Sequence, residues 1–125
     1  MGKKGFRELL TWRKAKGLAV QVCQLSAQGA LGSDFWLRDQ ICRSAVSIAS
    51  NLAEGDERDT DKEAVRFFRI AKGSLAEFRT QIQIACEAGR LKNDLYEALE
   101  EECETLGKML GSLIKARQGL RPLKR

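Results

Sequence analysis

Residues 34–58 read DFWLRDQICRSAVSIASNLAEGDER, and this segment determines the architecture that we expect of the chain. Its apolar residues recur with the spacing of an α-helix and form two neighbouring lines. The first line is Leu37, Ile41, Ala45, Ile48 and Leu52, and the second is Cys42, Val46, Ala49 and Ala53. Two adjacent lines are wider than the single stripe of an ordinary surface helix. We therefore expect this helix to be buried on two sides, one within its own bundle and the other available to a second copy of the chain.

Composition indicates one folded domain. The 125 residues suit a single hydrophobic core, and no internal repeat or second domain is visible. Hydrophobic residues make up 43% and charged residues 31%, which excludes the disordered class. The only proline, Pro122, lies in the last four residues, so no proline interrupts an earlier helix. We assign residues 1–125 to one domain, with a short basic arm at 1–6 and a basic tail at 118–125.

Boundary signals before the 34–58 segment predict a first helix over about residues 7–28. Gly29 follows its last periodic position and is expected to cap its C-terminus. Residues 29–33 are expected to form a short loop. Ser33 or Asp34 then caps the next helix, because a short oxygen-bearing side chain accepts hydrogen bonds from the first-turn amides. That helix should end near residue 55.

Two more helices follow. Residues 60–63, TDKE, form a capping box that starts a helix reaching about residue 87, which Gly89 ends. Gly73 lies in the middle of this helix, where glycine costs about 1 kcal/mol relative to alanine. We therefore expect another helix to approach closely at Gly73. Asn93 is expected to cap the last helix. Four amphipathic helices with short connections predict an all-α, antiparallel up-down-up-down four-helix bundle.

Charge and cysteine content restrict the function. The net charge of +5 permits binding to nucleic acid, but a mixed solvated surface explains it equally well. The four cysteines form no Cys-x-x-Cys pair and are expected to be reduced core thiols of a cytoplasmic protein. The absence of histidine excludes His–Cys zinc sites and Ser-His or Cys-His catalysis. We expect no metal, no cofactor, no signal peptide and no membrane span.

The strongest candidate site is a polar line on the helix at 34–58, which shares a face with polar residues of the following helix. Its members are Ser47, Asn51, Glu54 and Arg58, with Arg66, Arg69, Ser74 and Glu77 on the next helix. An enzyme could use Glu54 and Glu77 as paired acid and base. The favoured interpretation is a hydrogen-bonded seam between helices with carboxylates neutralised by arginines. No motif supplies a phosphate loop or an activated nucleophile, so we predict that the protein is not an enzyme.

Basic residues on these two helices form a second candidate site. They recur three or four positions apart and could follow a phosphate backbone. They are Lys62, Arg66, Arg69 and Lys72 on one helix, and Arg38 and Arg43 on the other. No cluster of exposed aromatic residues for base stacking is apparent from the sequence. A solvated helix face is the competing explanation.

Three motifs resemble the four-helix-bundle proteins encoded in intervening sequences of bacterial 23S ribosomal RNA genes. SIASNLAEG at 47–55 is similar to the family's SIPxNIAEG, and RFFRIAKGSLAE at 66–77 to its RFLxIAxGSxxE. The third is LxxWxxA at 9–15. Ala49 stands where the family usually has proline, so a weaker kink is expected, and Asp56 stands where an apolar residue is common. Carried over by position, the motif residues are Asn51, Glu54, Gly55, Arg58, Gly73, Ser74 and Glu77.

The resemblance implies a left-handed four-helix bundle that assembles as a homo-oligomer, most often a ring of five. It also implies a distant relation to the accessory protein of diversity-generating retroelements, a basic pentameric barrel that binds reverse transcriptase and nucleic acid. The leading hypothesis is therefore a non-enzymatic, homo-oligomeric accessory protein that binds RNA or DNA through Lys and Arg contacts to phosphate. The alternative is a scaffold that binds another protein and has no affinity for nucleic acid.

Overall fold

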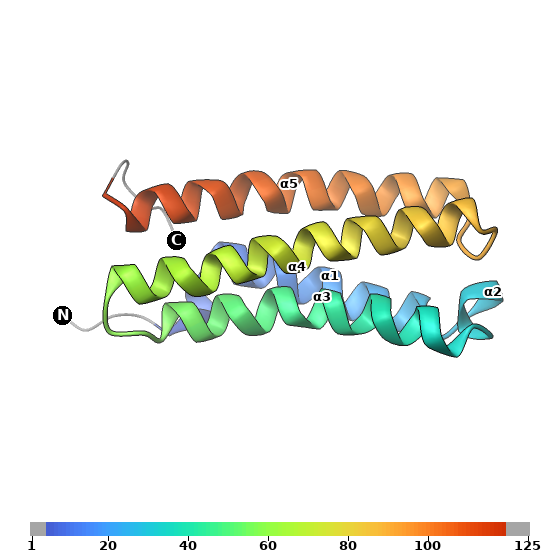
Figure 1. Cartoon of the computed structure of the whole chain (residues 1–125), viewed down its shortest axis with the longest axis horizontal. Helices are drawn as coiled ribbons and strands as arrows, with labels where there is room; N and C mark the ends of the chain where they lie inside the picture. Colours follow the sequence, from blue (N-terminus) through green and yellow to red (C-terminus); the bar gives the residue numbers. More distant parts are fainter. Residues whose placement is uncertain (1–4, 120–125) are drawn as a thin grey trace.

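A computed structural model describes residues 5–119 and shows four long helices side by side (Figure 1). They are α1 (Leu10–Leu25), α3 (Phe35–Asp56), α4 (Asp61–Glu87) and α5 (Asn93–Arg117). The short 3-10 helix η1 (Phe6–Glu8) precedes α1, and the short helix α2 (Gly29–Gly32) lies between α1 and α3. Consecutive long helices are antiparallel, and α5 also meets α1. The predicted all-α, up-down-up-down four-helix bundle is confirmed.

Helix α3 packs most extensively against its neighbours, first against α4 and then against α1. The first apolar line of the 34–58 segment forms its buried side, where Ala45, Ile48 and Leu52 are 0% exposed. Phe68 and Phe78 of α4 are likewise fully buried and belong to the same hydrophobic core. The bundle is therefore organised around α3, which continues without interruption past position 49, where the family usually has proline.

Three predicted helix ends agree with the structure. The Asp34 carboxylate accepts a hydrogen bond from the Leu37 amide at 3.2 Å, and the Thr60 hydroxyl accepts one from the Glu63 amide at 3.2 Å. These oxygens satisfy first-turn amides that have no partner within the helix. Gly89, just after α4, has a φ of +77°, a conformation in which glycine carries no steric penalty.

Several predicted boundaries are wrong. The first helix is shorter than residues 7–28, because α1 spans only Leu10–Leu25 and Ser26 caps its end. Gly29 therefore does not cap it but begins α2 with a φ of +63°, and residues 29–33 are not a simple loop. Asn93 is the first residue of α5, and Lys92 occupies the capping position. The Asn93 amide donates to Glu97 at 3.2 Å, so its side chain lies along the helix.

The close helix approach predicted at Gly73 is absent. A Cβ atom added to Gly73 would meet nothing within 4 Å, because this residue lies on the exposed side of α4. Gly55 is the tightly packed glycine instead. A Cβ atom there would lie 2.7 Å from Cε1 of Phe68 and 3.0 Å from the Ala64 carbonyl oxygen. The end of α3 can approach the first turns of α4 this closely only because residue 55 has no side chain.

Within residues 5–119, no helix combines the length and apolar character needed to cross a membrane. The predicted arm at 1–6 and tail at 118–125 lie largely outside the described residues. The two described ends of the chain, before η1 and after α5, lie at the same end of the bundle (Figure 1).

Candidate functional site

The polar residues between α3 and α4 form a hydrogen-bonded seam. Ser47 Oγ and Ser74 Oγ are 2.9 Å apart, and the Asn51 amide donates to the Ser47 carbonyl at 2.9 Å and to its hydroxyl at 3.1 Å. Farther along, the buried Ser44 hydroxyl donates to Gln81 Oε1 at 2.7 Å. We call these five side chains the polar seam. Its hydroxyl and amide groups are bonded to one another, which suits a role in aligning α3 with α4.

Glu54 and Glu77 are not placed to act on one substrate atom. Both are exposed, and Glu54 lies 3.5 Å from Arg58 one helical turn later. Ser47 of α3 pairs with Ser74 of α4, and the two helices are antiparallel. Glu54 lies seven residues after Ser47, so it is level with the residue seven positions before Ser74, which is about residue 67. Glu77 lies ten residues beyond that point, roughly 15 Å along the bundle. Two carboxylates that act as acid and base on one substrate would have to lie much closer to each other.

The described residues also offer no ready-made ligand set for a metal. Across residues 5–119, no three His, Cys, Asp or Glu side chains are grouped in a way that could hold an ion. In the same part of the chain, every buried side-chain nitrogen or oxygen has a hydrogen-bond partner. The polar seam therefore has no unsatisfied buried atom directed at a missing group.

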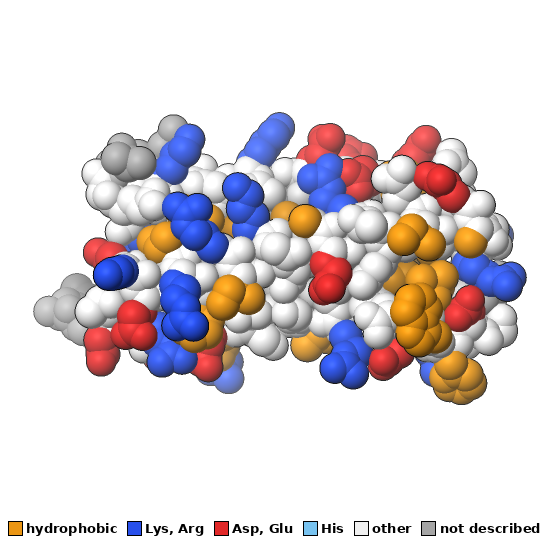
Figure 2. Space-filling view, in the orientation of Figure 1, with side chains coloured by type: hydrophobic (Ala, Val, Ile, Leu, Met, Phe, Trp, Pro, Cys, Tyr) orange, Lys and Arg blue, Asp and Glu red, His pale blue; other side chains and the backbone are white. Residues whose placement is uncertain are grey.

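The basic residues predicted on α4 are all exposed. Residues 62–72 span roughly 15 Å of helix. Two lysines of α5 extend this row, because α4 and α5 are antiparallel and the ion pair between Arg79 and Glu100 places Lys108 level with about residue 71 and Lys115 level with about residue 64. Figure 2 shows Lys and Arg gathered over the first half of α4 and the C-terminal half of α5. We call this group the basic surface: Lys62, Arg66, Arg69, Lys72, Lys108 and Lys115.

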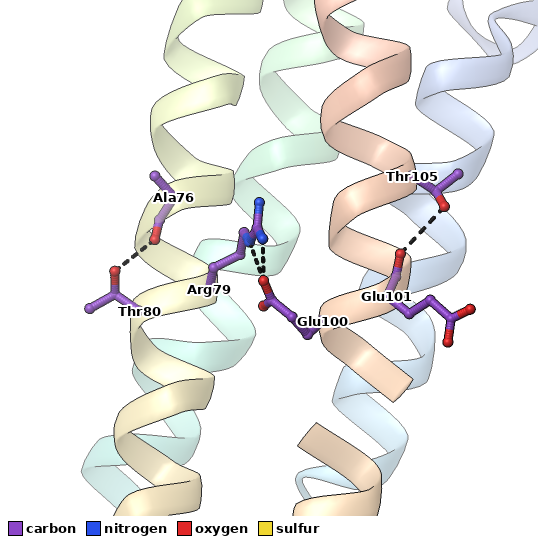
Figure 3. Close-up of polar contacts among 6 residues, drawn as sticks. All are labelled: Ala76, Arg79, Thr80, Glu100, Glu101 and Thr105. Carbon is purple, nitrogen blue, oxygen red and sulfur yellow. Dashed lines mark hydrogen bonds and ion pairs between the residues drawn. The ribbon is translucent and has the colours of Figure 1, made fainter. Parts of the chain in front are cut away.

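Ion pairs distinguish the basic surface from most other cations. The paired residues are Lys14–Glu102, Arg43–Asp39, Arg58–Glu54, Arg79–Glu100, Arg90–Asp34, Arg117–Asp56 and Arg117–Asp61. Arg79 of α4 reaches Glu100 of α5, whereas Thr80 and Thr105 beside them bond to carbonyl oxygens of their own helices (Figure 3). Within residues 5–119, no ion pair involves a side chain of the basic surface. Its charges are therefore available to an external anion.

Arg38 and Arg43 lie apart from the basic surface. Arg38 is half-buried, donates to the Gly32 carbonyl at 3.2 Å and lies over the Phe35 ring at 4.5 Å. Arg43 is exposed, but it precedes Ser47 by four residues and is therefore level with about residue 78 of α4. It lies roughly 18 Å along the bundle from Arg66. The structure does not bring these two arginines into the α4 row.

Sequence analysis missed a buried charge cluster at the end of the bundle that carries the basic surface. Asp56 is 0% exposed, and its Oδ1 lies 3.6 Å from Nη1 of Arg117. Nε of Arg117 also binds Asp61 at 2.6 Å, and its guanidinium lies 5.8 Å from the centre of the Phe68 ring. Asp56 was noted only as a departure from the family pattern. Its partner lies 61 residues later, a pairing that helical spacing cannot reveal.

Two exposed apolar features were also not predicted in full. Phe35 and Trp36 at the start of α3 are 73% and 72% exposed, although the sequence showed no evident aromatic cluster. Figure 2 shows hydrophobic side chains gathered over this end of α3, at the lower right. A groove also lies between α1 and α3, and its wall includes Val20 and the second apolar line at Val46. We call it the α1–α3 groove.

The cysteines differ more than predicted. Only Cys103 is a core thiol, and burial raises its pKa to about 12. Cys23 is exposed, which corrects the expectation that all four are in the core. Partial desolvation of its thiol, together with the neighbouring thiol of Cys42, raises the pKa of Cys23 as well. The Cys42 sulfur lies 2.9 Å from the Ser26 hydroxyl, so α1 and α3 meet here through polar as well as apolar contacts.

Comparison with known proteins supports a specific family. The chain matches the family model of the 23S rRNA-intervening sequence protein over residues 7–112. A structural neighbour is the crystal structure of a protein with unknown function from the S23 ribosomal protein family of Bacteroides thetaiotaomicron. The TM-score is 0.77 at 21% identity, covering 85% of this chain and 99% of that chain, a likeness of fold. Comparison with curated proteins gave no match. The family match covers most of the sequence, and the chain belongs to the 23S rRNA-intervening sequence protein family.

Proposed function

We propose that this protein is a non-enzymatic, homo-oligomeric accessory protein that binds the phosphate backbone of nucleic acid in the cytoplasm. The observation that carries the proposal is the basic surface. Six exposed cations lie on two adjacent helices, and no ion pair within residues 5–119 neutralises them. Such cations bind phosphates and release condensed counterions, a contribution that does not depend on base sequence.

Assembly would strengthen this binding. A single basic surface contacts few phosphates, whereas a closed oligomer presents one copy per subunit to the same polyanion. The number five follows only from the family resemblance. A non-enzymatic role is supported by the separation of Glu54 from Glu77 and by the mutual hydrogen bonds of the polar seam.

The test is a fluorescence anisotropy titration with labelled single-stranded RNA and, separately, duplex DNA. Each is measured at low and at physiological salt, and light scattering reports the mass in the same buffer. We expect binding that weakens steeply with salt. The double variant R66S/R69S should weaken binding to both probes. It should reduce the slope of log K against log salt by about 1.8 for duplex DNA and about 1.4 for single-stranded RNA, since each phosphate contact contributes about 0.9 and about 0.7, respectively.

A charge-matched control separates the basic surface from net charge. The variant R43S/K92S also removes two positive charges, from exposed positions outside the basic surface. It should bind almost as the wild type does. Equal losses in the two variants would mean that only the overall charge matters. No binding at low salt by an intact oligomer would overturn the proposal.

A second candidate function is supported by Phe35 and Trp36, since large exposed aromatic side chains are typical of protein interfaces. In that case the protein would be a scaffold without affinity for nucleic acid. The same titration distinguishes the two functions. The scaffold predicts no RNA or DNA binding at any salt concentration and no effect of R66S/R69S on partner binding.

A further inference from the structure

We propose that Phe35 and Trp36 of one copy of this chain dock into the α1–α3 groove of another copy. The inference rests on the proposed function, because it supplies the interface for the homo-oligomer. It differs from that function in assigning contacts between copies to particular residues, and it can fail while nucleic-acid binding stands.

The protruding side is a rigid aromatic pair. Phe35 and Trp36 are 73% and 72% exposed and occupy the first two positions of α3. The Asp34 carboxylate caps this helix end, and the Arg38 guanidinium lies 4.5 Å from the centre of the Phe35 ring. Their backbone is therefore held in a regular helix, and docking would not have to order a loop. Aromatic residues presented in this way are frequent anchors of protein interfaces.

The receiving side is an apolar groove with a volume of about 600 Å³. Trp12, Ala19 and Val20 of α1 form one wall, and Val46, Ala49 and Ala53 of α3 form the other. Val20 is 49% exposed and Val46 is 46% exposed. The alanines leave room for bulky side chains, because they occupy contact positions without filling them. The groove accounts for the second apolar line of α3, which the bundle core leaves partly uncovered.

Several features favour a second copy as the occupant. Phe35, Cys42 and Ala49 are seven residues apart in sequence, so the aromatic pair and the groove lie along one side of α3. Two copies that meet along this side bring one apolar surface against the other. Charge does not oppose the contact: exposed Lys16 lines the groove, and beside the aromatic pair Asp39 is ion-paired with Arg43. The same chain thus carries both halves of the contact.

The size of the contact is also suitable. Burial of an aromatic residue covers roughly 150–250 Å² of surface. Two such residues contribute roughly 300–500 Å², which is about half of the roughly 800 Å² per partner of a stable interface, and the groove of the same subunit adds its own area when another copy fills it. Reciprocal or ring-like docking satisfies every groove, and either arrangement closes without leaving an aromatic pair exposed.

The test follows Trp36 fluorescence and molecular mass together. The variant W12F leaves Trp36 as the only tryptophan, and because Trp12 lines the groove, light scattering first verifies that W12F assembles as the wild type does. Its emission should shift to shorter wavelength as the protein is concentrated, while light scattering reports a mass above the 14.0 kDa monomer. In this background, V20E/V46E places charges in the groove and should return both signals to those of the monomer. F35S, which removes an anchor from the protruding side and retains Trp36, should weaken assembly.

The matched control is I84E, which adds a charge at an exposed apolar residue of α4, where Ile84 is 53% exposed. It should leave the mass unchanged, and circular dichroism verifies the fold of every variant. An oligomer that persists in both V20E/V46E and F35S, or Trp36 emission that does not shift on assembly, overturns the proposed contact. Wild-type protein that remains monomeric also overturns the oligomeric part of the proposed function. RNA binding is measured separately, so a failure of the proposed contact between copies can be distinguished from a failure of nucleic-acid binding.

Discussion

The carboxylate of Asp56, at the last residue of α3, lies 3.6 Å from the guanidinium of Arg117, at the last residue of α5. Asp56 is fully buried, and the Arg117 side chain is 15% exposed. Arg117 also binds Asp61 in the first turn of α4 at 2.6 Å. One guanidinium therefore joins three helices at the end of the bundle that carries the basic surface.

Replacing Arg117 with alanine should destabilise the fold strongly. It would leave Asp56 buried without this cation, and breaking a buried ion pair costs about 3–5 kcal/mol. Urea unfolding measures the loss. The double variant D56L/R117M should lose less, because it removes the buried charge as well. R43A, which breaks an exposed pair, should change the free energy of unfolding little. A loss in R117A no larger than in R43A would contradict the structural role of this pair.

Two glycines of the family motif should respond to alanine in opposite directions. G55A places a Cβ atom 2.7 Å from the Phe68 ring and 3.0 Å from a backbone oxygen, so it should cost about 1–3 kcal/mol through overpacking. G73A meets nothing within 4 Å and should stabilise the helix by about 1 kcal/mol. Thermal or urea unfolding compares them. Destabilisation by G73A would indicate that Gly73 packs against another copy of the chain.

The Ser47–Ser74 contact should be energetically coupled. S74A removes one hydrogen bond but leaves Ser47 bonded to Asn51, so a loss of about 1 kcal/mol is expected. S47A also removes a contact of Asn51 and should cost somewhat more. In a double-mutant cycle, S47A/S74A should lose less than the sum of the single variants, since both remove one shared bond. Strict additivity would show that the hydroxyls do not interact.

The buried thiol of Cys103 should make stability fall at alkaline pH. Burial raises its folded-state pKa to about 12, above the ordinary value of 9.0. In the unfolded chain the thiol loses its proton near the ordinary value, while the folded protein keeps it. The unfolded state therefore binds fewer protons, and the free energy of unfolding decreases from about pH 9 toward pH 12. Urea unfolding of wild type and C103A should show a steeper decrease in wild type; parallel curves would contradict this origin.

Thiol labelling offers an independent check of cysteine burial. At pH 8, iodoacetamide should modify exposed Cys23 of the dilute, monomeric protein much faster than Cys103, because burial shields the Cys103 thiol and raises its pKa to about 12. Peptide mass spectrometry distinguishes the two. Equal labelling of both residues in the folded protein would contradict the burial of Cys103.

The candidate site could be predicted only in part. Residues three or four apart on one helix share a face, so the α4 row from Lys62 to Lys72 was visible in the sequence. Lys108 and Lys115 join that row only through the antiparallel register of α4 and α5. Arg38 and Arg43 carry the same charge and were predicted together with this row, but their positions along α3 place them in another part of the bundle. Charge can be counted in a sequence, whereas its pairing depends on packing.

Local patterns predicted the four helices, a cap at Thr60, a cap at Ser33 or Asp34, and the buried line of α3, because these depend on residues within a few positions of one another. The remaining features depend on how the helices pack in the tertiary structure. This packing brought Asp56 to Arg117 across 61 positions and left Gly73 exposed while Gly55 was enclosed. Contacts between helices depend on register and crossing distance, which no local pattern encodes.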